Sequence, residues 1–489
     1  MKIKSVIKTI FSMDLFKAVF LLVSILGVCP ISAVVVTPLL KVFHLYGFAV
    51  VIFDLLGEKR LLKNSGRLIL VLFSLSYCMT ILTNLELLNF SGISNFVYLF
   101  WALAIVFSYG KMSEKVNKIS SMIICFAITA ANIVGIVMFY LKFCMYVHPY
   151  GYVGMYIFEN RLCGLFGNPN VLGLVCLIGI CLSAILYFYT AKKYSFIFII
   201  TGVINMIALL LANSRTQIIS VAAIAAVYVF LILLKNKISF KRFIVSFLAG
   251  VLAAAIVLGG GKVVQFGLAF TDYRYGYYLA HIDGGEEVHS KYPLPKFDKD
   301  DYEKGFGFGG LGGLSGIIDR ESAGLNGRPE LWAAGFKIFG AYPIFGGGLD
   351  NHNNSLTEIG SDLIGIGGNL HNSYLDLLAA CGLGGFGCFI AFLVIMLLKT
   401  KNYFLYSDKK NYCTVAMLIA IVLGFMLDAV ADSTFIASFY PSAIAFWFFM
   451  AWLAALLEKA EKDCGKYKEE PLFTLYNRFT NKLKTKKED

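Results

Sequence analysis

Charged residues are scarce in this chain, at 15% of its 489 residues, whereas hydrophobic residues reach 58%. So low a charged fraction excludes a set of ordinary soluble domains. It indicates a polytopic membrane protein in which one membrane domain accounts for nearly all of the chain. We therefore predict an all-α fold built from transmembrane helices.

Motifs that would indicate soluble or metal-dependent chemistry are also missing. None of the eleven cysteines has zinc-ligand spacing, and most lie in apolar runs, where they are interpreted as small core residues. The glycine-rich run 305–313 lacks the lysine and hydroxyl residue of a phosphate loop, and the run Gly259–Lys262 has no Ser or Thr after its lysine, so both are interpreted as flexible hinges. Asp350, His352 and His371 are suitable metal ligands, but they form no ligand-spaced motif, and we predict no metal site.

The net charge of +12 is spread over short loops and a lysine-rich tail. This distribution is typical of a cytoplasmic membrane face and does not favour a nucleic-acid partner. The N-terminus has the positive start of a signal peptide, but it continues into a long apolar stretch without a small-x-small cleavage site. We expect it to be retained as the first transmembrane helix.

Twelve apolar stretches are long enough to cross about 30 Å of hydrocarbon as helices. They lie near residues 16–37, 42–57, 68–88, 92–109, 119–142, 170–190, 194–212, 216–234, 243–260, 373–398, 412–430 and 435–457. Every basic loop follows an even number of these crossings, so both termini are predicted to be cytoplasmic. The outer face then receives the loops that contain Arg161 and Arg215, together with a long segment over about 261–372.

This topology divides the chain into four predicted parts. They are nine helices over 1–260, an extracytoplasmic segment with amphipathic helices over 261–372, three helices over 373–457, and a basic cytoplasmic tail over 458–489. The extracytoplasmic segment exceeds ordinary loop lengths, which favours a functional cap. Within it, Glu330–Phe339 has an amphipathic pattern after Pro329, a suitable first residue of a helix.

Arg161 is a candidate anion-binding residue on the predicted outer face. It precedes the turn Asn168-Pro169-Asn170, in which we expect Asn170 to cap the following helix and leave its positive end pointing outward. An interfacial arginine that extends to lipid headgroups is an equally weighted alternative.

Arg215 and Arg328 are two further candidates. Arg215 lies in a tight turn between two spans, where a charge is costly unless it faces a polar cavity, so a functional role is favoured. Arg328 taken alone is interpreted as a solvent-exposed charge or a partner of Glu330. Asp428 and Asp432, at the outer end of the eleventh span, either bind sugar hydroxyls or meet one of the arginines.

His371 and Asn372 stand where the long polar segment re-enters the membrane as a glycine-spaced helix. A histidine can take a proton from a hydroxyl at neutral pH, and its place beside lipid indicates a lipid-anchored substrate. The alternative is a residue at a helix start that bonds to backbone. Asn372 can cap this helix, and Gly382 and Gly385 form a small-residue face on which other helices can pack.

These motifs, in this order, resemble those of the O-antigen ligase and polysaccharide polymerase superfamily of bacterial envelope proteins. The resemblance extends from about Arg161 to Trp452. The ligase signature is histidine, then Asn, Ser or Gln, nine residues and G-x-x-G, and it is met by His371, Asn372, Gly382 and Gly385. Further agreement with the wider superfamily comes from RxxGxFxNPN at Arg161, S-R-T at Arg215, R-x-x-L-W at Arg328 and P-I-x-G-x-G over 343–348.

The resemblance implies transfer of a glycan from an undecaprenyl-pyrophosphate carrier to a hydroxyl, with no cofactor, metal or nucleotide sugar, in a C-type glycosyltransferase-like fold of the bacterial plasma membrane. Arg215 and Arg328 are then expected to clamp the pyrophosphate. His371, kept neutral by nearby arginines, is expected to act as base or to orient the acceptor. The expected substrate-binding residues are Arg161, Asn168, Asn170, Asn372, Asp428 and Asp432.

Three functions remain open from the sequence. The signature favours a ligase with a lipid, wall polymer or protein acceptor. The Lys-, Ile- and Phe-rich composition resembles that of low-GC Gram-positive bacteria, which make no lipopolysaccharide core, and this favours a repeat-unit polymerase of capsule or exopolysaccharide. A flippase is the third, although transporters often have duplicated halves and midplane charges, whereas here the notable charges gather at one predicted face.

Overall fold

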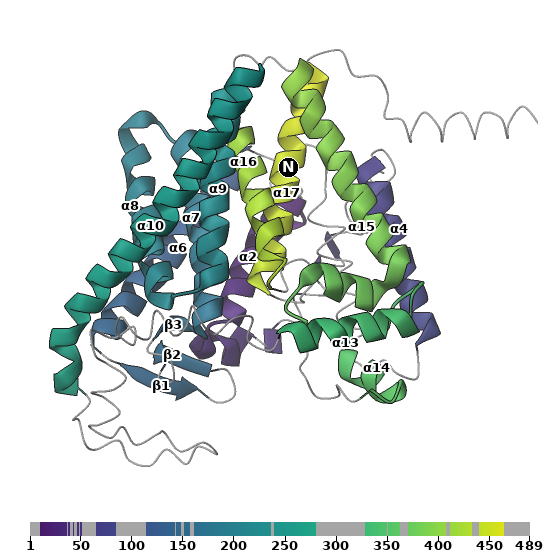
Figure 1. Ribbon diagram of the computed structural model, residues 1–489, viewed down its shortest axis with the longest axis horizontal. Coiled ribbons are helices and arrows are strands. Elements are labelled where there is room, and N and C mark those ends of the chain that lie inside the picture. The colour runs from purple at the N-terminus through teal and green to yellow at the C-terminus, as the bar shows by residue number, and fades with distance from the viewer. Residues whose placement is uncertain are drawn as a thin grey trace, which may run out of the picture. The chain divides into compact units, whose positions relative to one another are not determined.

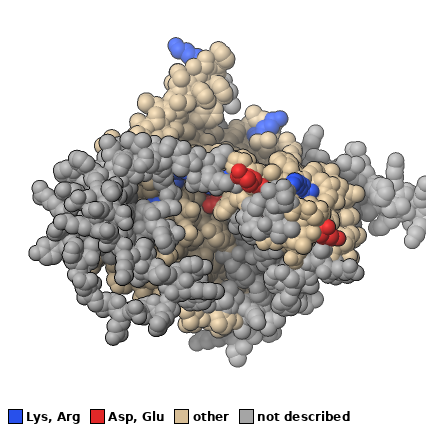
Figure 2. Space-filling model, turned by 60° about the horizontal axis from the view of Figure 1, so that its bottom comes forward, with Lys and Arg blue, Asp and Glu red and all other residues tan. Residues whose placement is uncertain are grey.

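Long apolar helices dominate the structure, a computed structural model of the chain (Figure 1). The structure describes residues 10–36, 38–39, 43, 46–47, 49–50, 65–84, 114–141, 143–147, 151–156, 161–235, 239–279, 328–349, 351–361, 370–406, 411–432 and 440–463. On the face shown in Figure 2, charged side chains of these residues are few.

Within these ranges, seven helical segments are long and apolar enough to cross a membrane. They are Lys115–Tyr140, Pro169–Tyr189, Lys192–Ala212, Arg215–Leu234, Phe240–Gln265, Ser373–Leu405 and Pro441–Glu461. Three apolar helices are shorter, at Leu15–Gly27, Leu72–Thr83 and Tyr412–Asp428. The predicted span near 92–109 and most of that near 42–57 lie outside the described residues, so the total of twelve stays a prediction.

One compact unit of the chain comprises Leu22–Pro38 and Ser121–Asn326. It holds most of α6 (Glu114–Tyr140) and then α7 (Pro169–Tyr189), α8 (Lys192–Ala212), α9 (Arg215–Leu234) and α10 (Phe240–Leu279). Buried polar side chains join α6 to α8: the Nδ2 of Asn132 donates to the Oδ1 of Asn205 at 2.7 Å, and the Nδ2 of Asn205 donates to the Oγ1 of Thr129 at 3.1 Å. Such bonds between helices hold a membrane bundle in register.

A three-stranded antiparallel sheet in the same unit departs from the predicted all-α fold. Its strands β1 (Cys144–Val147), β2 (Gly151–Tyr156) and β3 (Arg161–Gly167) pair in the order β1-β2-β3. The sheet lies at the end of the helices where α7 begins (Figure 1). Its strands are short and mix glycine with aromatic residues, so they show no strict apolar alternation that would have revealed them.

The other unit comprises Met1–Leu21, Leu39–Ser120 and Gly327–Asp489. It contains the first part of α2 (Met13–Gly27) and then α4 (Ser65–Thr83), α13 (Arg328–Ala341), α14 (His352–Glu358), α15 (Ser373–Tyr406), α16 (Tyr412–Asp428) and α17 (Pro441–Asp463). Helix α13 covers the stretch Glu330–Phe339 that was predicted to be helical, although it begins at Arg328, one residue before Pro329.

Two predicted elements differ in detail from the structure. The first span, expected over 16–37, is interrupted after Gly27, because Pro30 cannot donate a backbone hydrogen bond to a continuing helix. Helix α10 continues through Gly259–Gly261, where a flexible hinge was expected, and ends at Leu279.

Candidate functional site

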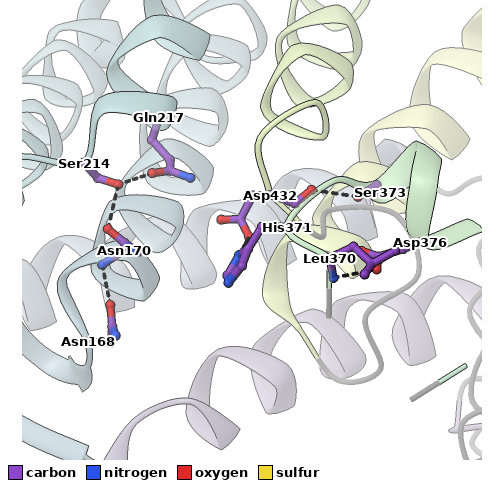
Figure 3. Close-up of polar contacts among 9 residues, drawn as sticks. All are labelled: Asn168, Asn170, Ser214, Gln217, Leu370, His371, Ser373, Asp376 and Asp432. Atoms are coloured by element: carbon purple, nitrogen blue, oxygen red, sulfur yellow. Dashed lines mark hydrogen bonds and ion pairs between the residues drawn. The ribbon is translucent and has the colours of Figure 1, made fainter. Parts of the chain in front are cut away.

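The first group of candidate residues surrounds the start of α7 (Figure 3). Asn168 has extended backbone angles, and its Oδ1 accepts a hydrogen bond from the amide of Asn170 at 2.8 Å, so Asn168 is the N-cap. The prediction that Asn170 caps this helix is therefore wrong. Asn170 lies in the first turn of the helix, with Pro169 before it, and its side-chain oxygen accepts bonds from other elements.

Arg161, in β3, is only 4% exposed and bonds to the protein itself. Its Nε donates to the carbonyl of Ala212 at 2.6 Å, and its Nη2 donates to the Oδ1 of Asn170 at 2.8 Å and to the carbonyl of Asn213 at 3.3 Å. The guanidinium thus fastens β3 and α7 to the turn between α8 and α9. This geometry assigns Arg161 a supporting position rather than an open anion site.

That turn, Asn213–Arg215, is called the arginine turn below. Asn213 ends α8 in the left-handed conformation, with φ 47°, and Arg215 is the first residue of α9 and is half-buried. A Cβ added at Gly173 would lie 2.5 Å from the Cβ of Ser214 and 3.2 Å from the Oε1 of Gln217. Only glycine at this position lets α7 approach the turn so closely. The buried hydroxyl of Ser214 also donates to Gln217.

The second group lies at the start of α15, where Leu370–Asn372 form the histidine turn. The Oδ1 of Asn372 accepts from the amides of Tyr374 and Leu375, both at 3.1 Å, so Asn372 caps α15 as the sequence predicted. The buried Asp376 accepts from the amide of Leu370 at 2.8 Å. These bonds hold the backbone on both sides of the histidine.

His371 itself adopts φ 48°, a left-handed conformation that costs free energy for a residue with a side chain. Its side chain is 47% exposed, and its Nδ1 lies 3.6 Å from the Oδ1 of Asp432 (Figure 3). Strained backbone of this kind persists where the surrounding bonds over-determine it, and it often occurs at functional sites. The turn thus presents one imidazole nitrogen to a carboxylate and leaves the Nε2 on the other side of the ring.

Asp432 is held in place by the start of α15. The amide of Ser373 donates to the carbonyl of Ala429 at 2.8 Å, and its hydroxyl donates to the carbonyl of Asp432 at 3.0 Å. The hydroxyl of Tyr374 donates to the carbonyl of Met426 at 2.9 Å. From the sequence, arginines are expected beside His371, and Asp432 is expected to meet sugar hydroxyls or an arginine. The structure instead places the carboxylate of Asp432 beside the imidazole.

Two further residues of this region are Asp428 and Tyr440, and Tyr440 lies close enough to Asp428 and Asp432 to interact with their charges. Asp428 is fully buried as the last residue of α16. Burial, together with the negative charges of Asp432 and Asp428, raises the pKa of the Tyr440 phenol, which precedes α17. Tyr440 has no distinguishing signal in the sequence, because a tyrosine before an apolar run is an ordinary interfacial residue.

Arg328 begins α13, and this helix packs on the histidine turn. A Cβ at Gly335 would lie 2.5 Å from the Cδ1 of Leu370 and 2.8 Å from the Cγ of Leu375. These leucines share a buried cluster with residues of α13, α14 and α15. Arg328 is half-buried. Its helix is therefore fixed to the residues that flank His371.

Two glycine motifs that lie far apart in sequence form one joint in the structure. Helix α15 breaks at Gly382, with φ 59° and ψ −166°, and the loop 343–348 enters the break. The amides of Gly347 and Gly348 donate to the carbonyls of Ala379 and Ala380 at 2.8 and 3.0 Å. In the other direction, the amides of Leu383 and Gly384 donate to the carbonyls of Pro343 and Ile344 at 2.8 and 3.0 Å. The loop therefore satisfies the backbone groups that the broken helix exposes.

Metal-ligand residues are dispersed in this structure. No group of three His, Cys, Asp or Glu side chains within the described ranges could hold a metal ion. Asp350 lies outside those ranges, so the set of Asp350, His352 and His371 is not fully described. The ten described cysteines are all free thiols.

The apolar helices define a multi-pass membrane protein. Residues 196–390 match the family described as O-antigen ligase, and this match supports the O-antigen ligase and polysaccharide polymerase superfamily that the motifs indicated. The match runs from α8 into α15 and includes Arg215, Arg328, His371 and Gly382. It supports a membrane-bound glycan ligase- or polymerase-type function. A search of curated proteins found no match.

Proposed function

We propose that this protein transfers a glycan from undecaprenyl pyrophosphate to an acceptor hydroxyl at the outer face of the bacterial plasma membrane, with both of its termini in the cytoplasm. The observation that carries this proposal is the histidine turn. It holds a half-exposed imidazole in a strained conformation beside a carboxylate, within the segment that matches the O-antigen ligase family.

In this mechanism, His371 is the general base. With a proton on the Nδ1 directed at Asp432, the Nε2 carries the lone pair and can accept the proton of the acceptor hydroxyl. The acceptor oxygen then bonds to the anomeric carbon, while the bond from that carbon to the pyrophosphate oxygen breaks. Asp432 stabilises the positive charge that the imidazole gains, as the third member of a nucleophile–base–carboxylate arrangement. The distance of 3.6 Å is longer than a hydrogen bond, and such contacts often tighten when substrate binds.

The leaving pyrophosphate requires positive charge. We assign Arg215 and Arg328 to it, because guanidinium forks match phosphate oxygens in a bidentate manner and each residue is half-buried at the start of a helix. Arg161 supports the arginine turn through the bonds described above. We also assign Asn168, Asn372, Asp428 and Asp432 to substrate binding. Asn170 links Arg161 to Ser214.

Repeat-unit polymerisation of a capsule or exopolysaccharide is the reaction we favour, since the chain composition resembles that of bacteria without a lipopolysaccharide core. Transfer to a lipid, wall polymer or protein is the second candidate. It is favoured by the ligase signature from His371 to Gly385 and by the description of the matched family. Product size separates the two: a polymerase lengthens chains on the same carrier, whereas a ligase moves glycan to a new acceptor. Unchanged molecules on the opposite leaflet would indicate a flippase.

The central test uses purified protein in vesicles with a lipid-linked glycan donor, with products resolved by gel. We expect His371→Ala to lower kcat by about 100- to 10,000-fold, the usual contribution of a general base. His371→Gln keeps a polar side chain without a usable base and should be equally impaired. Activity of the glutamine variant near that of wild type would assign His371 to acceptor orientation instead.

For the pyrophosphate clamp, Arg215→Ala and Arg328→Ala should each raise the donor KM and lower kcat. Arg242→Ala is the matched control, because it removes an equal charge from an exposed position near the start of α10. Turnover in Arg215→Ala equal to that of the control would exclude the clamp.

A further inference from the structure

Gln265 lies late in α10 and reaches the arginine turn. It is 1% exposed, and its Nε2 donates to the carbonyl of Leu210 at 3.0 Å and to the Oδ1 of Asn213 at 3.2 Å. One turn earlier, a Cβ at Gly261 would lie 3.3 Å from the Cδ2 of Leu210. Glycine there lets α10 approach the end of α8 closely enough for the amide to reach these acceptors.

The arginine turn is therefore held by two side chains from different elements. Arg161 in β3 binds the backbone carbonyls of Ala212 and Asn213, while Gln265 in α10 binds the side chain of Asn213 and the last turn of α8. Asn213 is the left-handed residue of this turn, a conformation in which asparagine is enriched because its side chain can bond locally. These bonds determine where α9, and hence its first residue Arg215, begins.

The burial of Gln265 is not explained by packing alone. Its Oε1 is buried and has no hydrogen-bond partner among the residues that the structure describes. Burying an amide with an unpaired oxygen costs free energy that a methionine of similar shape would not. In return, the Nε2 donates two hydrogen bonds, one to the last turn of α8 and one to Asn213 in the arginine turn.

We infer that Gln265 is a positioning residue for Arg215, which acts by fixing the arginine turn. This inference rests on the proposed role of Arg215 in binding the pyrophosphate of the donor. Its consequence is that a displacement of α10, which precedes the long segment before α13, would change the position of Arg215 and therefore the affinity for the donor.

Gln265→Met tests this inference, because it keeps the size of the side chain and removes the donors. We expect the donor KM to rise about ten-fold with little change in kcat, as for the loss of a hydrogen bond of ordinary strength. Gln265→Glu, which directs carboxylate oxygens at two acceptors, should raise the KM further. Thermal stability of each variant in detergent serves as the check on folding.

Asn213→Gly gives a second approach that does not alter α10. Glycine adopts φ 47° without strain, so the turn can keep its shape while the acceptor for Gln265 is lost. A rise in donor KM with unchanged melting temperature would support the inference. An unchanged donor KM in both Asn213→Gly and Gln265→Met would overturn it.

An Arg215→Lys background separates this inference from the proposed function. If Gln265 acts through the guanidinium, Gln265→Met should raise the donor KM less than three-fold once Arg215 is lysine. An equal ten-fold effect in both backgrounds would show a general structural role and refute the inference. Should Arg215→Lys and Arg215→Ala both retain full activity, the proposed clamp fails, whatever the result at Gln265.

Discussion

The joint between α15 and the loop 343–348 makes Gly382→Ala the most informative substitution in this chain. Gly382 has φ 59° and ψ −166°, a region that is almost restricted to glycine. A Cβ there would lie 2.4 Å from the carbonyl oxygen of Ile344 and 2.7 Å from the amide nitrogen of Gly346. Both contacts are with backbone, so no side chain can rotate away, and the loop itself must move.

The expected cost follows from these contacts. Placing alanine in this conformation costs about 1–3 kcal/mol. Moving the loop also weakens the two bonds from Leu383 and Gly384 to Pro343 and Ile344, each of which contributes about 1 kcal/mol. The free energy of unfolding should therefore fall by about 3–5 kcal/mol. The melting temperature in detergent should fall by about 3–5 °C, because the entropy of unfolding is about 1 kcal/mol/K for a chain of 489 residues.

The assay is a thermal melt followed by size-exclusion chromatography, with glycan transfer measured on the same preparation. Gly387→Ala is the matched control in the same helix, because a Cβ there meets nothing within 4 Å. The control should be neutral or more stable by up to about 1 kcal/mol, since alanine favours a helix over glycine. Equal melting temperatures for the two variants would refute the account of this joint.

Two further predictions concern the two turns. Asp432→Asn should lower kcat by about 10- to 100-fold and leave the donor KM nearly unchanged, because an amide cannot stabilise the charged imidazole; steady-state kinetics checks this, and a change in KM alone would speak against the pairing. Gly173→Ala should displace the arginine turn and lower both activity and thermal stability. Gly259→Ala, with open space around it in α10, should keep activity and leave thermal stability equal or slightly higher. Identical behaviour of these two glycine variants would contradict the packing argument.

Much of the helical framework could be predicted from hydropathy, because a long apolar run has few alternatives in a membrane. The helices at Lys192–Ala212 and Arg215–Leu234 begin and end within a few residues of the predicted spans. The three-stranded sheet could not be predicted from the sequence, because its strands are only four to seven residues long and show no clear alternation of apolar and polar residues.

For the candidate site, residue types could be selected from the sequence, but their partners could not. His371 and Asn372 stood out through the signature, and the cap at Asn372 followed from local chemistry. The pairing of His371 with Asp432 joins positions that are far apart in the chain, and the hydropathy pattern does not predict which distant residues will meet. The same holds for Gln265, because a single polar residue at the end of an apolar run does not indicate its bonding partners.

The proposed function depends most on the donor sugar reaching the histidine turn. A lipid-linked pyrophosphate donor with a diazirine on its first sugar, photolysed in vesicles and followed by peptide mapping, tests this directly. We expect the peptide containing His371 to be labelled and unlabelled donor to protect it. A His371 peptide without label, or labelling that unlabelled donor does not reduce, would show that the donor sugar does not bind there.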